Sequence, residues 1–184
     1  MKGIAFTLLN ELVEQSFGME TWDTVLQRTG LDGIFTAAGS YPDDDVFRIV
    51  TVLSEISGLP PEVLVRTFGE FMFKGFVEQY PHFFPEGQKA RELLKSVDSI
   101  IHVEVRKLFP DAAPPTFACE ERDDGTLLMT YRSPRRLCIL AEGLINGAAQ
   151  YFQEPITHRQ IACMYRGADH CCFELTFGGS PDAC

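Results

Sequence analysis

Hydrophobic residues recur every three or four positions from residue 4 to residue 109, and this spacing predicts a series of amphipathic helices. The first helix carries Ile4, Leu8, Leu9, Leu12 and Val13 and ends near Gly18. Others are predicted over 21–29, 47–56, 62–80 and 89–109, with a glycine or proline at or just beyond each end. The first part of the chain, about residues 1–84, is therefore expected to form a helical lobe.

After residue 114 the pattern changes to one that favours strands. Residues 116–121 and 126–133 read as a hairpin around a turn at 123–125, and 160–166 and 171–177 read as a second hairpin around 167–170. A helix is predicted between them, over 137–152. The fold class is therefore α+β: a helical lobe, then over about residues 85–177 a helix and a four-stranded antiparallel sheet with one crossing helix. The polar end, 178–184, is expected to be a flexible tail.

The composition narrows the class of protein. The 184 residues are enough for one domain, and 26 acidic against 16 basic residues give a formal net charge of -10. That charge argues against a nucleic-acid partner, because such binding depends on contacts with phosphates. The first apolar run is short and interrupted by Glu11 and Glu14, so neither an export signal nor a membrane span is expected. A reducing cytoplasm is the expected location, with the six cysteines as thiols or metal ligands.

The sequence lacks the common motifs of nucleotide-binding and hydrolytic sites. GxGxxG after a strand, GxxxxGK[ST], HExxH, GxSxG and the CxxCH of covalent haem attachment are all missing. The sequence shows neither a pair of residues for acid–base catalysis nor a nucleophile with an activating base. It also shows no distal pair of histidine and arginine, which a peroxidase would need. A binding module is therefore expected rather than an enzyme.

Two groups of polar residues stand in apolar surroundings. His102 lies on the helix predicted over 89–109, whose apolar stripe it adjoins, so it is either a buried core histidine or an axial ligand to haem iron. Tyr131, Ser133 and Arg135 alternate, and in an extended segment they share one face. A phenol, a hydroxyl and a guanidinium together suit a carboxylate or a phosphate, although a solvated sheet face would look the same.

The cysteines near the C-terminal end and the many aromatic residues suggest two further sites. Cys163 and Cys171 flank the second hairpin turn and could meet across it, and with Cys138 they would give three thiols for zinc or for a redox switch. The spacing lacks a CxxC knuckle, so ordinary cysteines remain the simpler interpretation. The 15 phenylalanines, many between residues 68 and 84, indicate either a Phe-rich core or a wide apolar pocket.

Taken together, these residues resemble the haem nitric oxide/oxygen-binding (H-NOX) family, sensors related to the haem domain of soluble guanylate cyclase. The resemblance spans residues 1–177 and rests on MKG at the start, FGE at 68–70, His102, FPDAAPPTF at 109–117, and YRSPR at 131–135 followed by Gly143. The YRSPR run matches the family's YxSxR motif, about thirty residues after a histidine on a helix. The resemblance implies one haem-binding domain with haem b between the lobes.

The resemblance also assigns roles by position. His102 corresponds to the axial ligand of ferrous haem, Tyr131, Ser133 and Arg135 to the clamp on the haem propionates, and Pro115 to the proline that bends the porphyrin. The pocket positions are occupied by Ala5, Leu9, Met72, Phe76, Leu140 and Leu144.

The expected function is a gas sensor that binds NO and CO and excludes O2. Members that retain O2 carry a distal tyrosine where this chain has Leu140, and NO binds ferrous iron without such a donor. Signalling would follow when NO weakens the iron bond to His102 and the haem relaxes. A stand-alone bacterial member would regulate a separate histidine kinase or cyclic-di-GMP enzyme.

An alternative from another class is a zinc/thiol redox sensor that regulates a signalling partner. Some family members bind zinc through three cysteines and a histidine, and Cys138, Cys163 and Cys171 match the thiol positions. Gln160 stands where that histidine would be, so His158, His170 or Cys172 would have to supply the fourth ligand.

Overall fold

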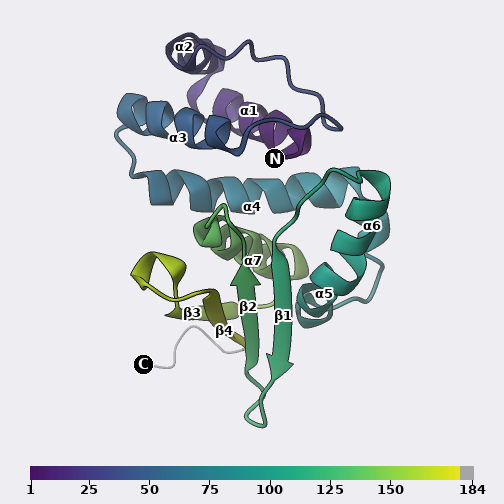
Figure 1. Cartoon of the computed structure of the whole chain (residues 1–184). Helices are drawn as coiled ribbons and strands as arrows, with labels where there is room; N and C mark the ends of the chain where they lie inside the picture. Colours follow the sequence, from purple (N-terminus) through teal and green to yellow (C-terminus); the bar gives the residue numbers. More distant parts are fainter. Residues whose placement is uncertain (179–184) are drawn as a thin grey trace.

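The fold is described from a computed structural model of the chain, which covers residues 1–178 (Figure 1). The tail predicted for 178–184 lies outside the described residues, apart from Gly178. The N-terminal half is helical: α1 (Gly3–Phe17), α2 (Met19–Thr29), α3 (Asp43–Ser57), α4 (Pro61–Gln79) and a short 3-10 turn, η1 (Pro81–Phe83). These helices lie where the hydrophobic spacing predicts them. Gly30 and Gly58 end α2 and α3 in the left-handed conformation, with φ of 69° and 72°.

The helix predicted over 89–109 is correct in extent but is not one regular α-helix. It consists of α5 (Ala90–Ser96), a π-helical segment η2 (Val97–Ile101) and α6 (His102–Leu108). The π segment ends where His102 begins α6, and the His102 N–H donates to the Val97 carbonyl. A π segment changes the direction in which the following side chains point, and such segments occur often at functional sites. The interruption therefore favours a functional role for His102.

A four-stranded antiparallel sheet follows, as predicted. Its strands are β1 (Thr116–Glu121), β2 (Leu127–Arg132), β3 (Ile156–Ala162) and β4 (Cys171–Phe177), in the spatial order β1-β2-β4-β3. Helix α7 (Cys138–Phe152) connects β2 to β3 and packs against the sheet (Figure 1). The first hairpin turns at 123–125 as expected, with Gly125 at φ 83°.

The second hairpin differs from its predicted bounds. Its first strand was expected over 160–166 but runs over Ile156–Ala162, and residues Met164–Arg166 form a 3-10 turn, η3. Residues along β3 alternate between half-buried and exposed, yet the half-buried positions include His158 and Gln160, so the apolar period that marks a strand is absent. A bulge between Gln160 and Ala162 then changes the register against β4.

Helices α4 and α7 join the helical lobe, α1–α4, to the sheet (Figure 1). Their backbones meet at two glycines: a Cβ on Gly69 would lie 2.5 Å from the Leu140 carbonyl oxygen, and one on Gly143 would lie 2.1 Å from the Arg66 carbonyl oxygen. One core cluster fills the helical lobe around Phe6 and Phe68, and a second lies between the sheet and α7 around Phe173. The two lobes therefore keep separate cores on either side of this helix pair.

Candidate functional site: an apolar cavity with one histidine

A cavity of about 380 Å³ lies where helices α1, α4, α5, α6 and α7 meet the strands β1 and β2. Its wall is largely apolar, and six of the seven predicted pocket residues belong to it: Ala5, Met72, Phe76, Pro115, Leu140 and Leu144. The phenylalanine-rich stretch also contributes, because Phe73, Phe83 and Phe84 line the cavity. The many phenylalanines of this stretch therefore serve two purposes: some line a wide pocket, and Phe68 packs in the core.

Leu9 is not where the sequence placed it. It lies one helical turn beyond Ala5 on α1, is 2% exposed, and packs inside the core of the helical lobe. It is not among the residues that line the cavity. Since α1 crosses the cavity only near its N-terminal end, Ala5 reaches the wall and the next turn does not.

His102 lies on the cavity wall, and among the described residues it is the only histidine there. Its Nδ1 lies 3.4 Å from Asp98 Oδ1, and the same carboxylate oxygen accepts a hydrogen bond from the Phe117 N–H at 3.3 Å. Burial lowers the pKa of His102, against the opposing effect of Asp98. The imidazole is therefore neutral at physiological pH, and because Nδ1 faces Asp98, Nε2 is the nitrogen left to ligate a metal.

Two further residues of α6, Val105 and Leu108, also line the cavity. No residue of α6 is buried, and Leu108 is 62% exposed although it lines the cavity. An apolar helix face that meets a cavity instead of a core is typical of a wall built for a large apolar ligand.

Tyr131, Ser133 and Arg135 converge on the cavity, as their spacing suggested, but not through a continuous strand. β2 ends at Arg132, and a turn over the following residues brings Ser133 and Arg135 to the wall. The buried Tyr131 hydroxyl accepts a hydrogen bond from the Leu137 N–H at 3.0 Å, and burial raises the pKa of Tyr131. This turn, rather than the alternation of a strand, therefore gathers the three side chains.

Arg135 is held from both lobes. Its Nε lies 2.7 Å from Asp43 Oδ1, at the start of α3, and its Nη1 donates to the Ala113 carbonyl at 2.5 Å. Its side chain is only 16% exposed. A guanidinium fixed in this way at the edge of an apolar cavity is a ready partner for a carboxylate of a bound ligand.

These features fit a haem. A large flat macrocycle needs a wide apolar cavity, its iron needs a neutral imidazole, and its two propionates need cations at one edge. The cavity offers the apolar wall, His102 and Arg135 in that arrangement. The donor set therefore suits the group that the sequence predicted.

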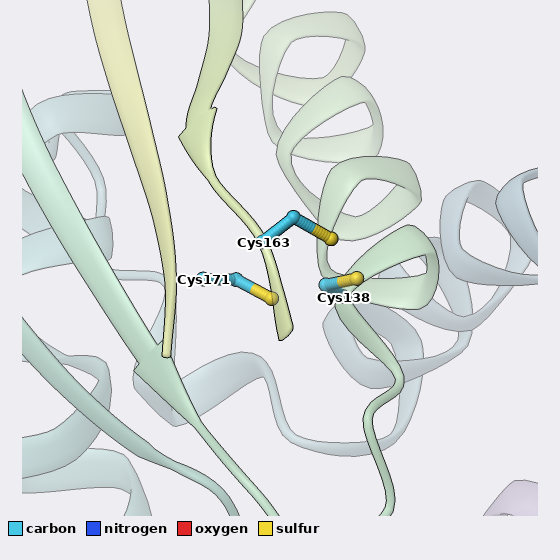
Figure 2. Close-up of side chains that lie close together, drawn as sticks. All are labelled: Cys138, Cys163 and Cys171. Atoms are coloured by element: carbon cyan, nitrogen blue, oxygen red, sulfur yellow. The ribbon is translucent and has the colours of Figure 1, made fainter. Parts of the chain in front are cut away.

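Three cysteines that are not part of the cavity lining form a second candidate site (Figure 2). The sulfur atoms of Cys138, Cys163 and Cys171 lie within 4.8 Å of one another, and all three residues are buried. The prediction that Cys163 and Cys171 meet near Cys138 is confirmed. They come from the start of α7, the end of β3 and the start of β4.

The thiols of the cluster sit in unequal surroundings. Burial raises the pKa of Cys138 to about 12. Burial acts in the same direction on Cys163, but hydrogen bonds from the N–H groups of Tyr165 and Arg166 and from the neighbouring thiols bring its pKa below the ordinary value. The η3 turn therefore stabilises a thiolate at Cys163, which is the form that binds metals and reacts with oxidants.

None of the three residues considered as a fourth ligand belongs to this group among residues 1–178. His158 Nε2 pairs with Asn146 Oδ1 at 3.0 Å, and His170 Nδ1 pairs with Asp169 at 2.5 Å. Cys172 follows Cys171 on β4, so its side chain points to the opposite face of the sheet. Gln160, by contrast, lies near the cluster: its side chain opposes the rise in the pKa of Cys138, and its buried Nε2 has no hydrogen-bond partner among the described residues.

Sequence reasoning missed part of the cavity edge. Lys2, Ser40 and Asp111 line it as well, and they come from the N-terminus, the loop before α3 and the loop after α6. MKG and FPDAAPPTF were both noted in the sequence, yet nothing in their spacing shows that they meet. Tyr80, which follows the last residue of α4, lines the cavity too.

A helical lobe on a four-stranded sheet, with one histidine in the wall of an apolar cavity, defines a class of haem-binding sensor domains. A family model described as Haem-NO-binding matches residues 2–160. The chain belongs to this family, whose domain is a haem-binding gas sensor.

Similar solved structures and similar curated proteins support the same family. The H-NOX protein of S. oneidensis, solved in the Fe(II)NO state, is 32% identical and superposes with a TM-score of 0.92 over 97% of this chain and 100% of that one. The Fe(II) unliganded H-NOX protein of K. algicida is 30% identical, with a TM-score of 0.84 and 100% of both chains covered. Soluble guanylate cyclase gcy-35 of Caenorhabditis elegans is 26% identical over 148 residues, which are 76% of this chain and 21% of that protein. The chain thus spans about a fifth of the length of the curated relatives it matches.

Among residues 1–178, none of the helices combines the length and the apolar character that crossing a membrane requires.

Proposed function

We propose that residues 1–177 act as one sensor domain that binds NO, and also CO, at a ferrous haem b, and that discriminates against O2. The observation that carries the proposal is the single histidine in the wall of an otherwise apolar cavity, with Arg135 at its edge. Ferrous haem held in this way supplies an iron with one open coordination position for a diatomic gas. The related H-NOX protein of S. oneidensis has been solved in Fe(II)NO and Fe(II)CO states.

The chain's own residues would divide the work of holding the group. His102 would present Nε2, while Asp98 keeps Nδ1 occupied and fixes the plane of the ring. Arg135 would bind a propionate with Tyr131 and Ser133 beside it, and Pro115, whose carbonyl also contacts the His102 ring, would press on the macrocycle. All of these residues except Asp98 line the cavity.

Discrimination against O2 would come from the lack of a hydrogen-bond donor on three side chains of the cavity wall. Met72, Phe76 and Leu140 contribute no hydrogen-bond donor, whereas O2 takes up negative charge on iron and is retained where a donor faces it. NO needs no such donor. The apolar side chains therefore lower the affinity for O2 without a comparable loss for NO.

We expect the absorption spectrum of the dithionite-reduced, desalted protein to change with NO or CO but to stay unchanged in air. Leu140→Tyr introduces a phenol into the cavity wall and should produce a distinct spectrum in air. Tyr80→Phe is the matched control, because Tyr80 is a phenol already in the cavity wall, and it should behave as the wild type. A wild type that responds to air and loses that response in Tyr80→Phe would show that Tyr80, not Leu140, decides selectivity.

Signalling would begin at His102, because its helix is poised to move. His102 is the first residue after the π segment η2. Asp98, within that segment, contacts the His102 ring and accepts a hydrogen bond from the Phe117 N–H of β1, so it links the ring to this strand. Release of His102 from iron would let α6 shift and would relieve the contact at Pro115. A separate histidine kinase or cyclic-di-GMP enzyme would read this two-state change.

The cysteine cluster supports a second candidate function, a zinc or thiol redox site that regulates the same partner. Three buried sulfur atoms within 4.8 Å of one another, with Cys163 favoured as a thiolate, can hold zinc through three ligands and a fourth from solvent or from Gln160. Without metal, the same thiols can be oxidised to a disulfide.

We expect metal analysis of the purified protein to give about one zinc per chain, the ratio of a structural site. Cys171→Ser should lose the metal. Cys172→Ser is the matched control, since it is the next residue on the same strand with its side chain on the other face, and it should retain the metal. Wild-type protein without zinc would exclude the metal role, and thiol titration before and after peroxide would then decide whether the cluster forms a disulfide.

A further inference from the structure

Lys2 is held firmly at the polar edge of the cavity by the start of α1. Gly3, the next residue, donates its N–H to the Gly39 carbonyl at 2.8 Å, and a Cβ there would lie 1.8 Å from the Thr36 carbonyl oxygen. Lys2 itself forms an isolated bridge with Ser40. The glycine of MKG thus lets the helix start seat against the loop at 36–40, and this fixes where the Lys2 side chain begins.

The side chain of Lys2 is fixed as well. Its Nζ donates to Ser40 Oγ at 2.9 Å and lies 3.2 and 3.3 Å from the two carboxylate oxygens of Asp111. The ammonium lies 4.7 Å from the centre of the Phe109 ring, and the side chain is 15% exposed. A lysine with this little exposure and this many partners differs from the freely solvated lysines of a protein surface.

Lys2 and Arg135 occupy the same edge of the cavity. Arg135 donates to the Ala113 carbonyl, two residues after Asp111, so one short loop contacts both cations. Ser40 and Asp43, which contact Lys2 and Arg135 respectively, are likewise close in sequence. Lys2 and Arg135 therefore both line the polar edge of an apolar cavity, each paired with a carboxylate from the opposite lobe.

A haem carries two propionates, and the YxSxR residues supply one cation, Arg135. We propose that Lys2 binds the second propionate, with Ser40 as the positioning residue that holds its ammonium at the cavity mouth and Asp111 as the carboxylate that the propionate would displace. This inference rests on the proposed haem site. It predicts that the ammonium exchanges part of its pairing with Asp111, whose own side chain is 59% exposed and is well hydrated without it, for a ligand carboxylate.

A simple latch is the competing interpretation. Lys2–Asp111 and Arg135–Asp43 cross between the lobes in opposite directions and could serve only to hold them together. The two interpretations differ in what Asp111 does. A latch needs Asp111 as much as Lys2, whereas a propionate competes with Asp111 for the ammonium.

The decisive measurement compares protoporphyrin IX with its dimethyl ester, titrated into the metal-free protein by fluorescence. Neither porphyrin has iron, so His102 does not enter the result, and only the first has free carboxylates. Lys2→Gln should weaken binding of protoporphyrin IX about tenfold, the size of one lost charge-assisted hydrogen bond, and should leave the dimethyl ester unaffected. Lys2→Arg should restore most of the affinity. The matched control is Lys74→Gln, because Lys74 is a 74% exposed lysine on α4. This variant should leave the affinity for both porphyrins unchanged.

Asp111→Asn completes the test. If Lys2 binds the propionate, this variant should bind protoporphyrin IX as tightly as the wild type or more tightly. An equal loss of affinity in Lys2→Gln and Asp111→Asn, or an equal loss for both porphyrins, would overturn the proposal and leave a latch. If Lys2→Gln changes neither porphyrin while His102 still ligates haem in the wild type, only the role of Lys2 is wrong. A wild type that binds neither porphyrin would overturn the haem site and this proposal together.

Discussion

Replacing His102 with glycine should leave the reduced protein without its axial ligand and should remove the absorption spectrum of five-coordinate ferrous haem. His102 is the one histidine that lines the cavity among residues 1–178, so no neighbouring imidazole can substitute for it. The cavity and the propionate partners remain, and added imidazole should enter the space and restore the spectrum. Absorption and resonance Raman spectra, recorded with and without imidazole, measure this directly.

The matched control is His82→Gly. His82 lies on the short η1 turn beside the cavity-lining Phe83 but is not itself part of the wall. Its replacement should leave the spectrum as in the wild type. An unchanged spectrum in His102→Gly, or loss of the spectrum in both variants, would show that His102 is not the ligand.

The same variant tests the signalling step. Without a bond to His102, α6 should adopt the position proposed for the NO-bound state even in the absence of NO. Hydrogen exchange over 97–108 in the His102→Gly protein should therefore match that of the NO-bound wild type. If the variant instead matched the unliganded wild type, release of the histidine would not be the switch.

The sequence was sufficient where function depends on residues close together in the chain. The hydrophobic spacing predicted the helix that carries His102, and the YRSPR run predicted that Tyr131, Ser133 and Arg135 come together. What the spacing could not show is geometry within a segment. The π turn before His102 leaves no mark in the apolar spacing of the sequence, and the turn after β2 gathers Ser133 and Arg135 although no strand continues there.

Contacts between distant segments were the larger omission. Lys2, Ser40 and Asp111 meet only because α1, the loop before α3 and the loop after α6 converge at the cavity edge. Leu9 was expected at the wall because a family position was transferred to it, but its helix leaves the wall after Ala5. The cysteines were placed together correctly, since a hairpin brings the ends of its two strands together wherever the strand bounds fall.

Gly143→Ala should destabilise the protein more than an alanine at any other glycine of α4 or α7. A Cβ at this position would lie 2.1 Å from the Arg66 carbonyl oxygen and 2.8 Å from Gly69 Cα, so α4 and α7 would have to separate along their whole contact. Backbone cannot move aside as a side chain can. We expect a loss of about 3 kcal/mol in the free energy of unfolding, at the upper end for overpacked cores, despite the better helix propensity of alanine. Urea denaturation measures it.

Gly75→Ala provides the comparison that isolates this backbone contact. Gly75 is also buried on α4, but the atoms nearest to a Cβ there belong to the Leu8 side chain, at 2.4, 3.0 and 3.3 Å, and a side chain can change rotamer. Its cost should stay within about 1 kcal/mol, because the gain in helix propensity offsets a small repacking. Equal effects of the two substitutions would mean that α4 and α7 can separate freely. Because both helices line the cavity, Gly143→Ala should also shift the absorption maximum of the bound haem, whereas Gly75→Ala should not.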